Sequence, residues 1–412
     1  MSEISDTKKK MLKEMIKELH SGAAPQHVKE KFKQALAGIT SLEISKIEQE
    51  LVQEGMPREE IHRLCEVHML VFQEQLESQK PEIPTENPVN ILQEEHKVML
   101  QLTEMLKTIA KSVQRAPVPT EVTEDIAHLK HVKEDLVDSE KHYIREENVL
   151  FPMLEKHGVT EPPAIMWTEH NRIREEKKKF FTLVENYSTT GFQDFEAQLV
   201  EAADILSELL SSHFFKENNI LFPTAMKVVT SVEWIEIRKE FDKIGYCRFT
   251  PQHLIRAVQQ LERAEEKKPE PMLMPTALLQ FDTGEFSKAQ GESFLKTVPF
   301  DITFVDKDDV VRYFNKSEIF LRTKSVIGRK VQQCHPQKSV HVVNQILESF
   351  KTGKKDVAEF WIPMDNGAKL IHIRYFAVRD KDRNYLGTME VTQDITGIKK
   401  IEGEKRLLDW KD

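Results

Sequence analysis

Apolar side chains recur every three or four positions in four long, charge-rich segments, which begin near Val89, Thr120, Pro163 and Phe192. This spacing places the apolar side chains on one face of an α-helix, so each segment is predicted to be an amphipathic helix. Prolines between the segments indicate that each helix ends in a loop. The pattern therefore predicts an up-down four-helix bundle over about residues 90–225.

From Asp301 onward the pattern changes to short runs in which apolar and polar residues alternate, separated by Asp, Asn and Gly. Alternation with a period of two is typical of strands in a sheet that buries one face. We expect an antiparallel sheet of about five strands, with helices inserted between the second and the third. The runs cover residues 302–305, 310–314, 357–362, 369–377 and 385–391.

The segment ahead of the bundle, residues 8–77, also has helical spacing, with Gly and Pro near the ends of three or four short helices. Its last helix contains His62, Cys65 and His68 at three-residue spacing. These side chains are candidate metal ligands, but the same positions form an apolar stripe suited to packing, which we favour. A proline-rich, polar stretch then marks a domain boundary.

These patterns predict a multidomain architecture of the α plus α+β class. A second stretch rich in Lys and Pro, ending at Pro271, separates the helical part from the sheet. We expect a small helical domain at residues 8–80, the bundle with a trailing helix at 88–248, a helix and linker at 249–293, the sheet domain at 294–399 and a helical tail at 400–412.

Composition narrows the class of protein. The 412 residues are 39% hydrophobic and 31% charged, with a formal net charge of -9. No apolar stretch is long enough for a membrane span or a signal region, and no stripe of Lys and Arg suggests a nucleic-acid surface. Cys65, Cys247 and Cys334 lie too far apart in sequence to indicate a disulfide framework or a four-cysteine metal site. We expect a cytoplasmic protein with no membrane or nucleic-acid partner.

One motif occurs twice. Residues 142–152 read His-Tyr-Ile-Arg-Glu-Glu-Asn-Val-Leu-Phe-Pro, and residues 213–223 read His-Phe-Phe-Lys-Glu-Asn-Asn-Ile-Leu-Phe-Pro. A Glu-His pair precedes each copy, at residues 95–96 and 169–170. Two half-sites of one metal centre would show this duplication. The Leu-Phe-Pro ends are predicted to contribute to the core and to end each helix.

Residues four apart on a helix share one face, so the first His and the first Glu of each motif are directed at the same place. Four imidazoles and two carboxylates suit two metal ions with mixed nitrogen and oxygen ligation, and they fit bridged iron or manganese better than a closed tetrahedral zinc site. Asp138 and Glu169 are candidates for orienting the imidazoles, although both also suit a solvated helix face. The candidate ligands are His96, His142, Glu146, His170, His213 and Glu217.

The two motifs and their Glu-His pairs resemble the hemerythrin-like cation-binding domain over about residues 90–225. That resemblance implies a non-heme centre of two iron ions, with bridging carboxylates, the six candidates as ligands, and open positions for dioxygen, nitric oxide or peroxide. Oxygen-carrying members have a further histidine where this chain has Arg174, which argues against reversible oxygen storage. The ligand set is similar to that of the repair-of-iron-centres proteins, which are associated with nitrosative stress and iron-sulfur cluster repair.

The other two domains also have resemblances. The N-terminal segment resembles an uncharacterised helical domain found ahead of hemerythrin-like modules. The order of strands and helices over about residues 294–399 resembles a PAS domain, which implies a sensory or dimerising module that encloses a small ligand. His335 and His341 are candidate ligands for a heme or another cofactor there, with His372 as a third, and the alternative for each is helix capping or surface exposure.

Three functions fit these predictions. In the first, a cytoplasmic di-iron protein binds or reduces dioxygen or nitric oxide and couples this to the PAS module, which senses or forms a homodimer. In the second, the chain repairs damaged iron-sulfur centres, or donates iron to them, under nitrosative or oxidative stress, with an iron-sulfur protein as its partner. In the third, the metal only stabilises an interaction scaffold. All three need the same six ligands, and the sequence does not decide whether the chain is an enzyme.

Overall fold

The structure is a computed structural model that describes residues 87–256 and 278–404, together with scattered positions between residues 10 and 84. The chain divides into two compact units, residues 1–268 and 269–412. Each unit is described by itself below. Within the described ranges, no helix is both long and apolar enough to cross a lipid bilayer.

Two of the predicted segments lie outside the described residues. The N-terminal helical domain is described only at isolated positions, and His62, Cys65 and His68 are not among them. The predicted C-terminal helical tail is described only as far as residue 404. The 3₁₀ turn Ile398–Lys400 precedes it.

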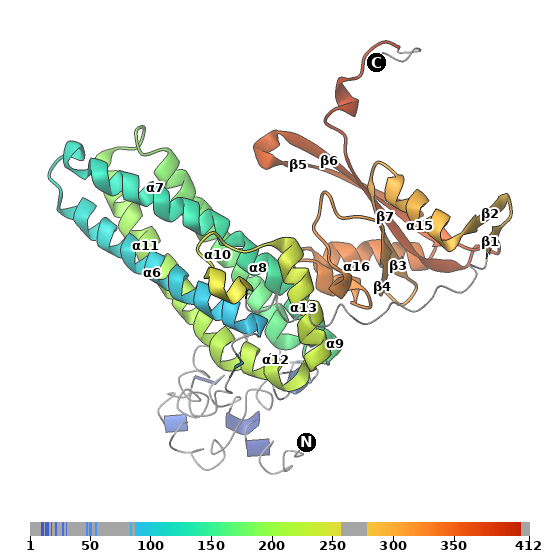
Figure 1. Cartoon of the computed structure of the whole chain (residues 1–412), viewed down its shortest axis with the longest axis horizontal. Helices are drawn as coiled ribbons and strands as arrows, with labels where there is room; N and C mark the ends of the chain where they lie inside the picture. Colours follow the sequence, from blue (N-terminus) through green and yellow to red (C-terminus); the bar gives the residue numbers. More distant parts are fainter. Residues whose placement is uncertain are drawn as a thin grey trace. The chain divides into compact units, whose positions relative to one another are not determined.

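The first unit contains the predicted four-helix bundle, whose helices lie side by side in Figure 1. Helix α6 contacts α7 and α11, and α10 contacts the same two neighbours, so the four helices enclose one interior. The 3₁₀ turn Pro119–Val122 leads into α7. The long helices are α6 (Pro88–Arg115), α7 (Thr123–Asp138), α10 (Glu161–Glu185) and α11 (Phe192–Lys216).

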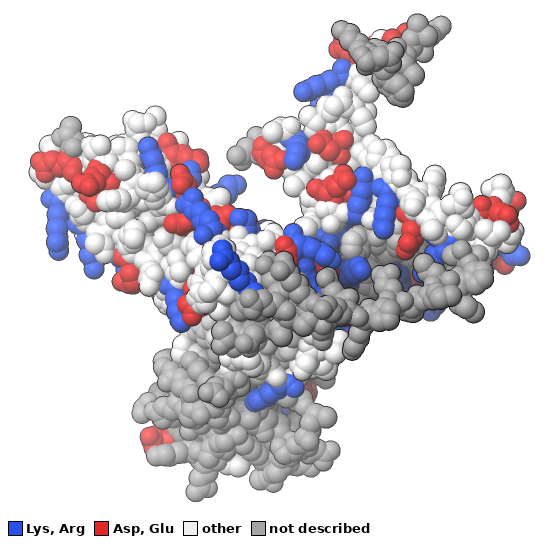
Figure 2. All heavy atoms as spheres, viewed as in Figure 1, with Lys and Arg blue, Asp and Glu red and all other residues white. Residues whose placement is uncertain are grey.

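Local sequence explains where these helices begin and which face they bury. The Asn87 side chain accepts a hydrogen bond from the Val89 backbone N–H at 2.9 Å, and Pro88 follows as the first residue of α6. Apolar side chains at helical spacing fill the half of the bundle away from the two repeated motifs. They include Leu106, Leu129, Phe180, Phe195 and Leu199. The surface in Figure 2 has Lys and Arg interspersed with Asp and Glu over the bundle.

The two motif helices do not end at their prolines, so that prediction was wrong. In each copy a π-helical turn follows the histidine helix, and the backbone N–H of the next residue bonds the carbonyl five residues back, as Phe151 does to Glu146. A proline is tolerated there because the wider turn has already displaced the usual bonding. The segments are α8 (Glu140–Arg145), π-helix Glu146–Leu150 and α9 (Phe151–Lys156), and then π-helix Glu217–Leu221 and α12 (Phe222–Val228).

A further helix, α13 (Ser231–Ile244), packs against α6, α8 and the first π-helical turn. Thr230 and Glu233 form a capping box at its start, in which each side chain bonds the backbone N–H of the other residue. The chain then passes through residues 245–251 and enters another helix at residues 252–256. This trailing segment lies against the bundle and contributes to the site described below.

The second unit contains a five-stranded antiparallel sheet, as predicted. Its strand order is β4-β3-β7-β6-β5. Helix α16 (Gln337–Lys351) lies between β4 and β5 in sequence. Gly387 in β7 passes so close to β3 that an added Cβ would lie 2.2 Å from the Val305 carbonyl oxygen. The strands are β3 (Asp301–Asp306), β4 (Val311–Phe314), β5 (Val357–Met364), β6 (Lys369–Arg379) and β7 (Tyr385–Asp394).

Part of the predicted linker is structured. A hairpin of β1 (Leu278–Phe281) and β2 (Gly284–Ser287) leads into α15 (Lys288–Thr297). Strands of four residues with nearly every side chain exposed show no burial pattern, so the sequence carried no signal for them. Short 3₁₀ turns occur at Lys324–Val326, Val331–Cys334 and Asp365–Gly367.

Candidate metal centre

The six candidate ligands meet in the interior of the bundle. Their side chains come from four helical segments: one His from α6, one from α10, and a His with a Glu from each repeated motif. All six are at most 1% exposed, so none is a surface residue. The positions are His96, His142, Glu146, His170, His213 and Glu217.

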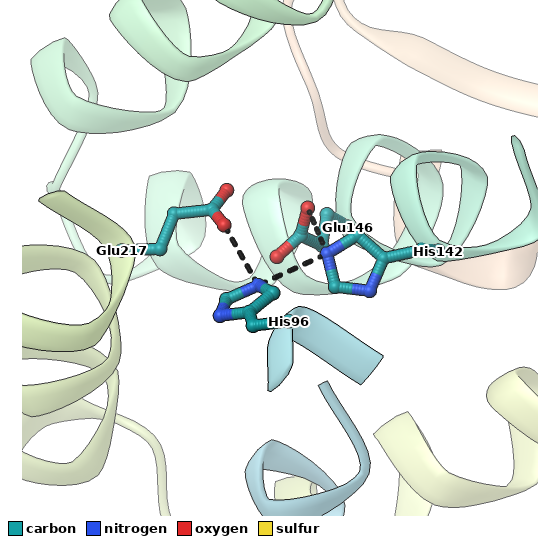
Figure 3. A group of neighbouring side chains, drawn as sticks. All are labelled: His96, His142, Glu146 and Glu217. Carbon is teal, nitrogen blue, oxygen red and sulfur yellow. Dashed lines mark hydrogen bonds and ion pairs between the residues drawn. The ribbon is translucent and has the colours of Figure 1, made fainter. Parts of the chain in front are cut away.

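Figure 3 shows the first group, in which two imidazoles face the two carboxylates. The Nε2 atom of His96 lies 3.2 Å from Nε2 of His142 and 3.0 Å from Oε2 of Glu217. His142 Nε2 is 3.4 Å from Oε2 of Glu146. These four ligand atoms all lie within 4.8 Å of one another, close enough to bind one metal ion.

The second group repeats this arrangement with the other two histidines. His213 Nε2 lies 3.0 Å from Oε1 of Glu217. His170 Nε2 lies 3.4 Å from Oε2 of Glu146 and 3.6 Å from Oε1 of Glu217. The four ligand atoms again lie within 4.8 Å of one another.

Both groups share the same two carboxylates. Glu217 directs Oε2 at His96 and Oε1 at His170 and His213. Glu146 directs Oε2 at both His142 and His170. Because a carboxylate can bridge two ions through its two oxygens, the arrangement suits a pair of neighbouring metal ions.

Three imidazoles are oriented by buried carboxylates behind them. In each, Nδ1 lies 2.8 Å from a glutamate oxygen: His142 with Glu95, His170 with Glu147, and His213 with Glu169. An ionised carboxylate only accepts, so each ring carries its proton on Nδ1 and turns the lone pair of Nε2 toward the centre. That is the tautomer a metal ligand needs.

Each of these outer carboxylates has a cation on its far side. Arg145 bonds Glu95, Lys216 bonds Glu169 at 2.6 Å, and Arg174 bonds both oxygens of Glu147 at 2.7 and 3.1 Å. Arg174 thus supports the carboxylate that orients His170. A cation beside each outer carboxylate leaves these pairs electrically balanced.

The trailing segment contributes to this support. Thr250 donates a hydrogen bond to Glu95 at 2.5 Å, and Arg145 donates to the Gly245 carbonyl at 3.2 Å. The guanidinium of Arg145 also lies over the rings of Phe241 and Tyr246. The trailing segment therefore helps to hold Glu95 in place, directly through Thr250, 155 positions away in sequence, and indirectly through Arg145, which bonds Gly245 100 positions further along.

The electrostatics keep two of the outer carboxylates, Glu95 and Glu147, ionised. Burial alone would raise the pKa of Glu95, but the charge of Arg145 and the hydrogen bond from His142 outweigh it and lower the pKa to about 2. Burial opposes ionisation of Glu147 in the same way, yet His170 and Arg174 lower its pKa.

The central carboxylates have no such cation among the described residues. Burial and the charge of Glu217 raise the pKa of Glu146, because two buried carboxylates this close together resist double ionisation. Burial opposes a charged imidazole at His170, but the nearby carboxylates of Glu146, Glu147 and Glu217 outweigh this and raise the pKa. In the metal-free protein, protons supply the positive charge that the cluster needs.

The unsatisfied atoms at the centre test whether a metal fits. Both oxygens of Glu146, both oxygens of Glu217, and Nε2 of His170 and of His213 are buried without a properly oriented hydrogen bond. Buried polar atoms without partners are rare, because each costs about 1–3 kcal/mol. Lone pairs from imidazole and carboxylate point at one another here, so a cation is the partner that would satisfy all of them.

Aromatic rings enclose the two single histidines in matching ways. His96 stacks on Phe214 and Phe222, with ring centroids 4.0 and 5.5 Å apart. His170 lies between Tyr143 and Phe151, at 4.6 and 5.6 Å. Since one ring of each pair is the Phe of a Leu-Phe-Pro repeat, these residues pack on the candidate ligands and do more than fill the core.

Sequence reasoning missed most of the outer partners. Of the two candidates it named, Glu169 bonds His213, whereas Asp138 bonds Lys141 and the Arg248 backbone N–H, away from the centre. The missed Glu95 carried a signal, because a Glu precedes the single His in both halves. Glu147 carried none, since the second copy has a different residue there.

The second unit has a cavity of about 240 Å³ between α16 and the sheet, lined mainly by Val, Ile, Leu and Phe side chains. Its polar lining includes His335, Tyr375 and Glu390, and Glu390 is paired with Arg322 at 2.8 Å. This volume is below the roughly 300–1,000 Å³ of pockets for drug-sized ligands.

The three histidines considered as PAS ligands have different positions. His335 lines the cavity and donates from Nδ1 to the Val331 carbonyl at 2.9 Å. His341 is exposed on α16 and does not line the cavity, because its helical position turns it to solvent. His372 pairs with Glu359 on the neighbouring strand. Only His335 is therefore placed to contact a cavity ligand.

Comparison with protein families gives three matches. Residues 87–225 match the hemerythrin HHE cation binding domain, residues 292–396 match a PAS domain, and residues 12–78 match a family of unknown function (DUF438). The chain therefore contains a hemerythrin HHE domain followed by a PAS domain, which confirms both resemblances. The N-terminal match is to an uncharacterised domain, as predicted.

Similar solved structures come from three bacteria. The C-terminal domain of a Streptococcus mutans protein is 32% identical, with 31% of this chain and 98% of that chain covered and a TM-score of 0.29. A sensory box sensor histidine kinase from Vibrio cholerae is 12% identical (26% and 91% covered, TM-score 0.20). A PAS domain from Colwellia psychrerythraea is 15% identical (26% and 97% covered, TM-score 0.22). No curated protein matches the chain.

Proposed function

We propose that this chain is a non-heme di-iron protein that binds or reduces a small oxidant, dioxygen or nitric oxide. The observation that carries the proposal is the pair of ligand groups that share two carboxylates with unsatisfied oxygens. Iron fits the mixture of imidazole and carboxylate donors, and manganese is the alternative with the same preferences. Iron, when bound, supplies reversible electron transfer and open coordination positions.

The charges of the surrounding residues favour an electron-accepting ligand. Each outer carboxylate has a cationic partner, so the uncompensated charge at the centre is that of Glu146 and Glu217. Two divalent ions would exceed it by two positive charges, in a region where every ligand is buried. A small neutral ligand that takes electrons from the metals would become an anion beside them. The total charge would stay the same, but the excess positive charge would stabilise the anion.

The chain's own side chains exclude bulk water and limit the size of the ligand. Beside the ligands lies a layer of Met99, Tyr143, Ile173, Leu210 and Phe214, all at most 1% exposed. Within this layer the Tyr143 hydroxyl is the one oxygen-bearing side-chain group, and its contact is a weak one to the Met99 sulfur at 4.0 Å. A diatomic molecule suits such a closed, mainly apolar site.

The PAS domain is proposed to sense a small molecule or to form a homodimer. Its cavity supports the first role, because an apolar space with a few polar groups suits a small ligand. Strand β5 is an edge strand, and Val357 and Trp361 on it are 52% and 66% exposed. A second copy pairing at this edge would cover them. The Trp361→Glu variant is expected to lower the fraction of dimer, which light scattering would show as a lower average molar mass.

A second candidate function is repair of iron-sulfur centres, or iron donation to them. Arg174 favours it, because it replaces the further histidine of oxygen-carrying relatives and is committed to Glu147. The readout is restoration of a nitric oxide-damaged cluster in a test protein. A metal-stabilised scaffold is the third possibility, and it requires a centre closed to added ligands.

The test is to load the full chain with Fe(II) under argon and to record optical spectra on adding dioxygen and, separately, nitric oxide. We expect two irons per chain and new absorption bands with at least one gas. The control is Glu146→Ala with Glu217→Ala, which removes both shared carboxylates and is expected to abolish the bands.

A matched control addresses general damage to the bundle. Glu94→Ala with Glu104→Ala removes two carboxylates from α6 that pair with surface lysines, and it should leave the iron content and spectra unchanged. Iron-free protein, or bound metal that neither gas affects, would contradict the proposal. Bound metal without gas bands would leave the scaffold as the remaining function.

A further inference from the structure

The two halves of the centre differ in what stands behind their imidazoles. His142, His170 and His213 each donate through Nδ1 to a buried carboxylate. The Nδ1 atom of His96 is equally buried, yet it has no hydrogen-bond partner among the described residues. The half that contains His96 is therefore less well supported.

One position in the repeat accounts for this difference. Glu147, which orients His170, directly follows the shared carboxylate of the first copy. In the second copy the corresponding residue is Asn218, whose Oδ1 is also buried without a hydrogen bond. By the symmetry of the repeat, Asn218 occupies the place from which a carboxylate would support His96. A neutral amide cannot make the imidazole as basic as a carboxylate does.

The supporting cation is missing from the same half. Arg174, which pairs with the carboxylate behind His170, follows that histidine by four residues. The residue four positions after His96 is Leu100, which packs against the apolar layer beside the centre. Both members of the outer ion pair are thus replaced in one half only.

The ring packed against each imidazole differs in the same direction. Tyr143 lies beside His170, whereas Phe214, the corresponding residue of the second copy, stacks on His96. Tyr143 is also approached by the Lys177 ammonium, 4.7 Å from its ring centre. Three separate positions therefore make the surroundings of His96 more apolar than those of His170.

We infer that the two metal positions are unequal, and that the ion beside His96 is bound more weakly and leaves first. The inference rests on the proposed two-metal centre. Removal of an outer partner typically lowers metal affinity about 10- to 100-fold, and we expect the two positions to differ by a similar factor. Glu146 and Glu217 are shared by both metal positions, so they do not offset the difference in affinity.

The test follows iron binding itself. The metal-free full chain is titrated with Fe(II) under argon in competition with a chromogenic chelator, and release is timed after adding excess chelator. We expect two irons that leave in two phases, with dissociation constants about 10- to 100-fold apart. A crystal loaded with one equivalent of Fe(II) should show anomalous density beside His170, and density beside His96 instead would overturn the inference.

Two reciprocal variants identify the cause. Asn218→Glu with Leu100→Arg rebuilds the missing ion pair and should slow the fast phase toward the slow one. Glu147→Asn copies the weaker half onto the stronger one and should make both irons leave quickly. Circular dichroism checks that each variant folds, and Glu147→Gln is the conservative replacement if Glu147→Asn does not.

The outcomes separate this inference from the proposed function. Two irons released in one phase, or a fast phase unchanged in the rebuilt variant, would contradict the inequality and leave the two-metal centre intact. A chain that takes up no Fe(II) would contradict the centre itself, and the inequality with it.

Discussion

The bundle and the PAS domain each enclose a candidate site, and the two interiors are built on opposite principles. In the bundle, six polar side chains converge, and several of their atoms are left without hydrogen bonds. In the PAS cavity the walls are mainly apolar, and its buried carboxylate, Glu390, has Arg322 and Thr392 as partners. The buried acceptors of the bundle fit a cation, whereas the buried carboxylate of the PAS cavity already has protein partners.

This contrast shows what can be inferred about the ligand of a buried site from its side chains alone. An excess of buried acceptors over donors implies a particular partner, because no rearrangement of the same side chains removes the imbalance. An apolar cavity limits the size and polarity of a ligand but demands none. The function of the bundle can therefore be stated more specifically than that of the PAS cavity.

The largest expected effect concerns the ion pair of Arg322 and Glu390 in the PAS cavity. Arg322→Met leaves Glu390 buried without its cation and should destabilise the PAS domain by about 3–5 kcal/mol. Urea unfolding measures this, followed through the fluorescence of Trp361 in a chain whose other tryptophans, Trp167, Trp234 and Trp410, are replaced by Phe. The control Arg383→Met removes an arginine that is 79% exposed from its pair with Asp356, and it should change the stability very little. Equal losses of stability in the two variants would contradict the view that Glu390 depends on Arg322 as its partner.

The second prediction concerns the bundle carboxylates. Glu146→Gln removes a buried carboxyl group whose charge is unfavourable without metal, because burial and the charge of Glu217 raise its pKa, so the metal-free bundle should gain about 1–4 kcal/mol of stability. The loaded protein should lose stability instead, because a shared ligand is gone. Thermal unfolding with and without Fe(II) checks both signs. A loss of stability in the metal-free variant would show that the cluster is complete without a cation.

The third prediction uses Lys177, which is buried in the bundle and donates to Ser139 at 2.8 Å. Burial lowers its pKa to about 8, below the roughly 10.4 of an exposed lysine. The cost of burying its charge is therefore fully present below pH 8 and disappears as the pH rises above 10.4. Lys177→Met should stabilise the bundle by about 1–3 kcal/mol at pH 7 and by almost nothing near pH 11. A gain independent of pH would contradict this.

The smallest effect concerns Glu233, at the start of α13. Burial would raise its pKa, but hydrogen bonds from Thr230, Lys156 and His157 lower it to about 2. Its stabilising contribution is therefore present above about pH 4.5 and lost as the pH falls toward 2. Glu233→Gln should cost about 1 kcal/mol at pH 6 and nothing at pH 2. Denaturant titrations at both values measure the difference, and equal costs at both would reject the assignment.

The sequence groups the six candidate ligands correctly, but it predicts their outer partners poorly. The inner six share helical phase within a motif that occurs twice, so local spacing is enough to group them. Thr250 reaches Glu95 from 155 positions away, and no local rule connects them. Glu147 differs from Asn218 across the repeat, so the repeat itself could not reveal it.

The fold shows the same division between local and distant information. The bundle helices and the five PAS strands follow from periodicity, because each buries one face. The helices continue past Pro152 and Pro223 because a π-helical turn precedes each, and this depends on backbone geometry that the residue pattern does not express. The β1–β2 hairpin has almost no buried side chains, so no pattern marked it.

The most direct test of the central claim is anomalous diffraction at the iron edge from crystals of the full chain loaded with Fe(II) under argon. The account predicts two peaks in the bundle, one beside His96 and His142 and one beside His170 and His213, with Glu146 and Glu217 next to both. A single peak at full loading, a peak elsewhere in the chain, or none would contradict it.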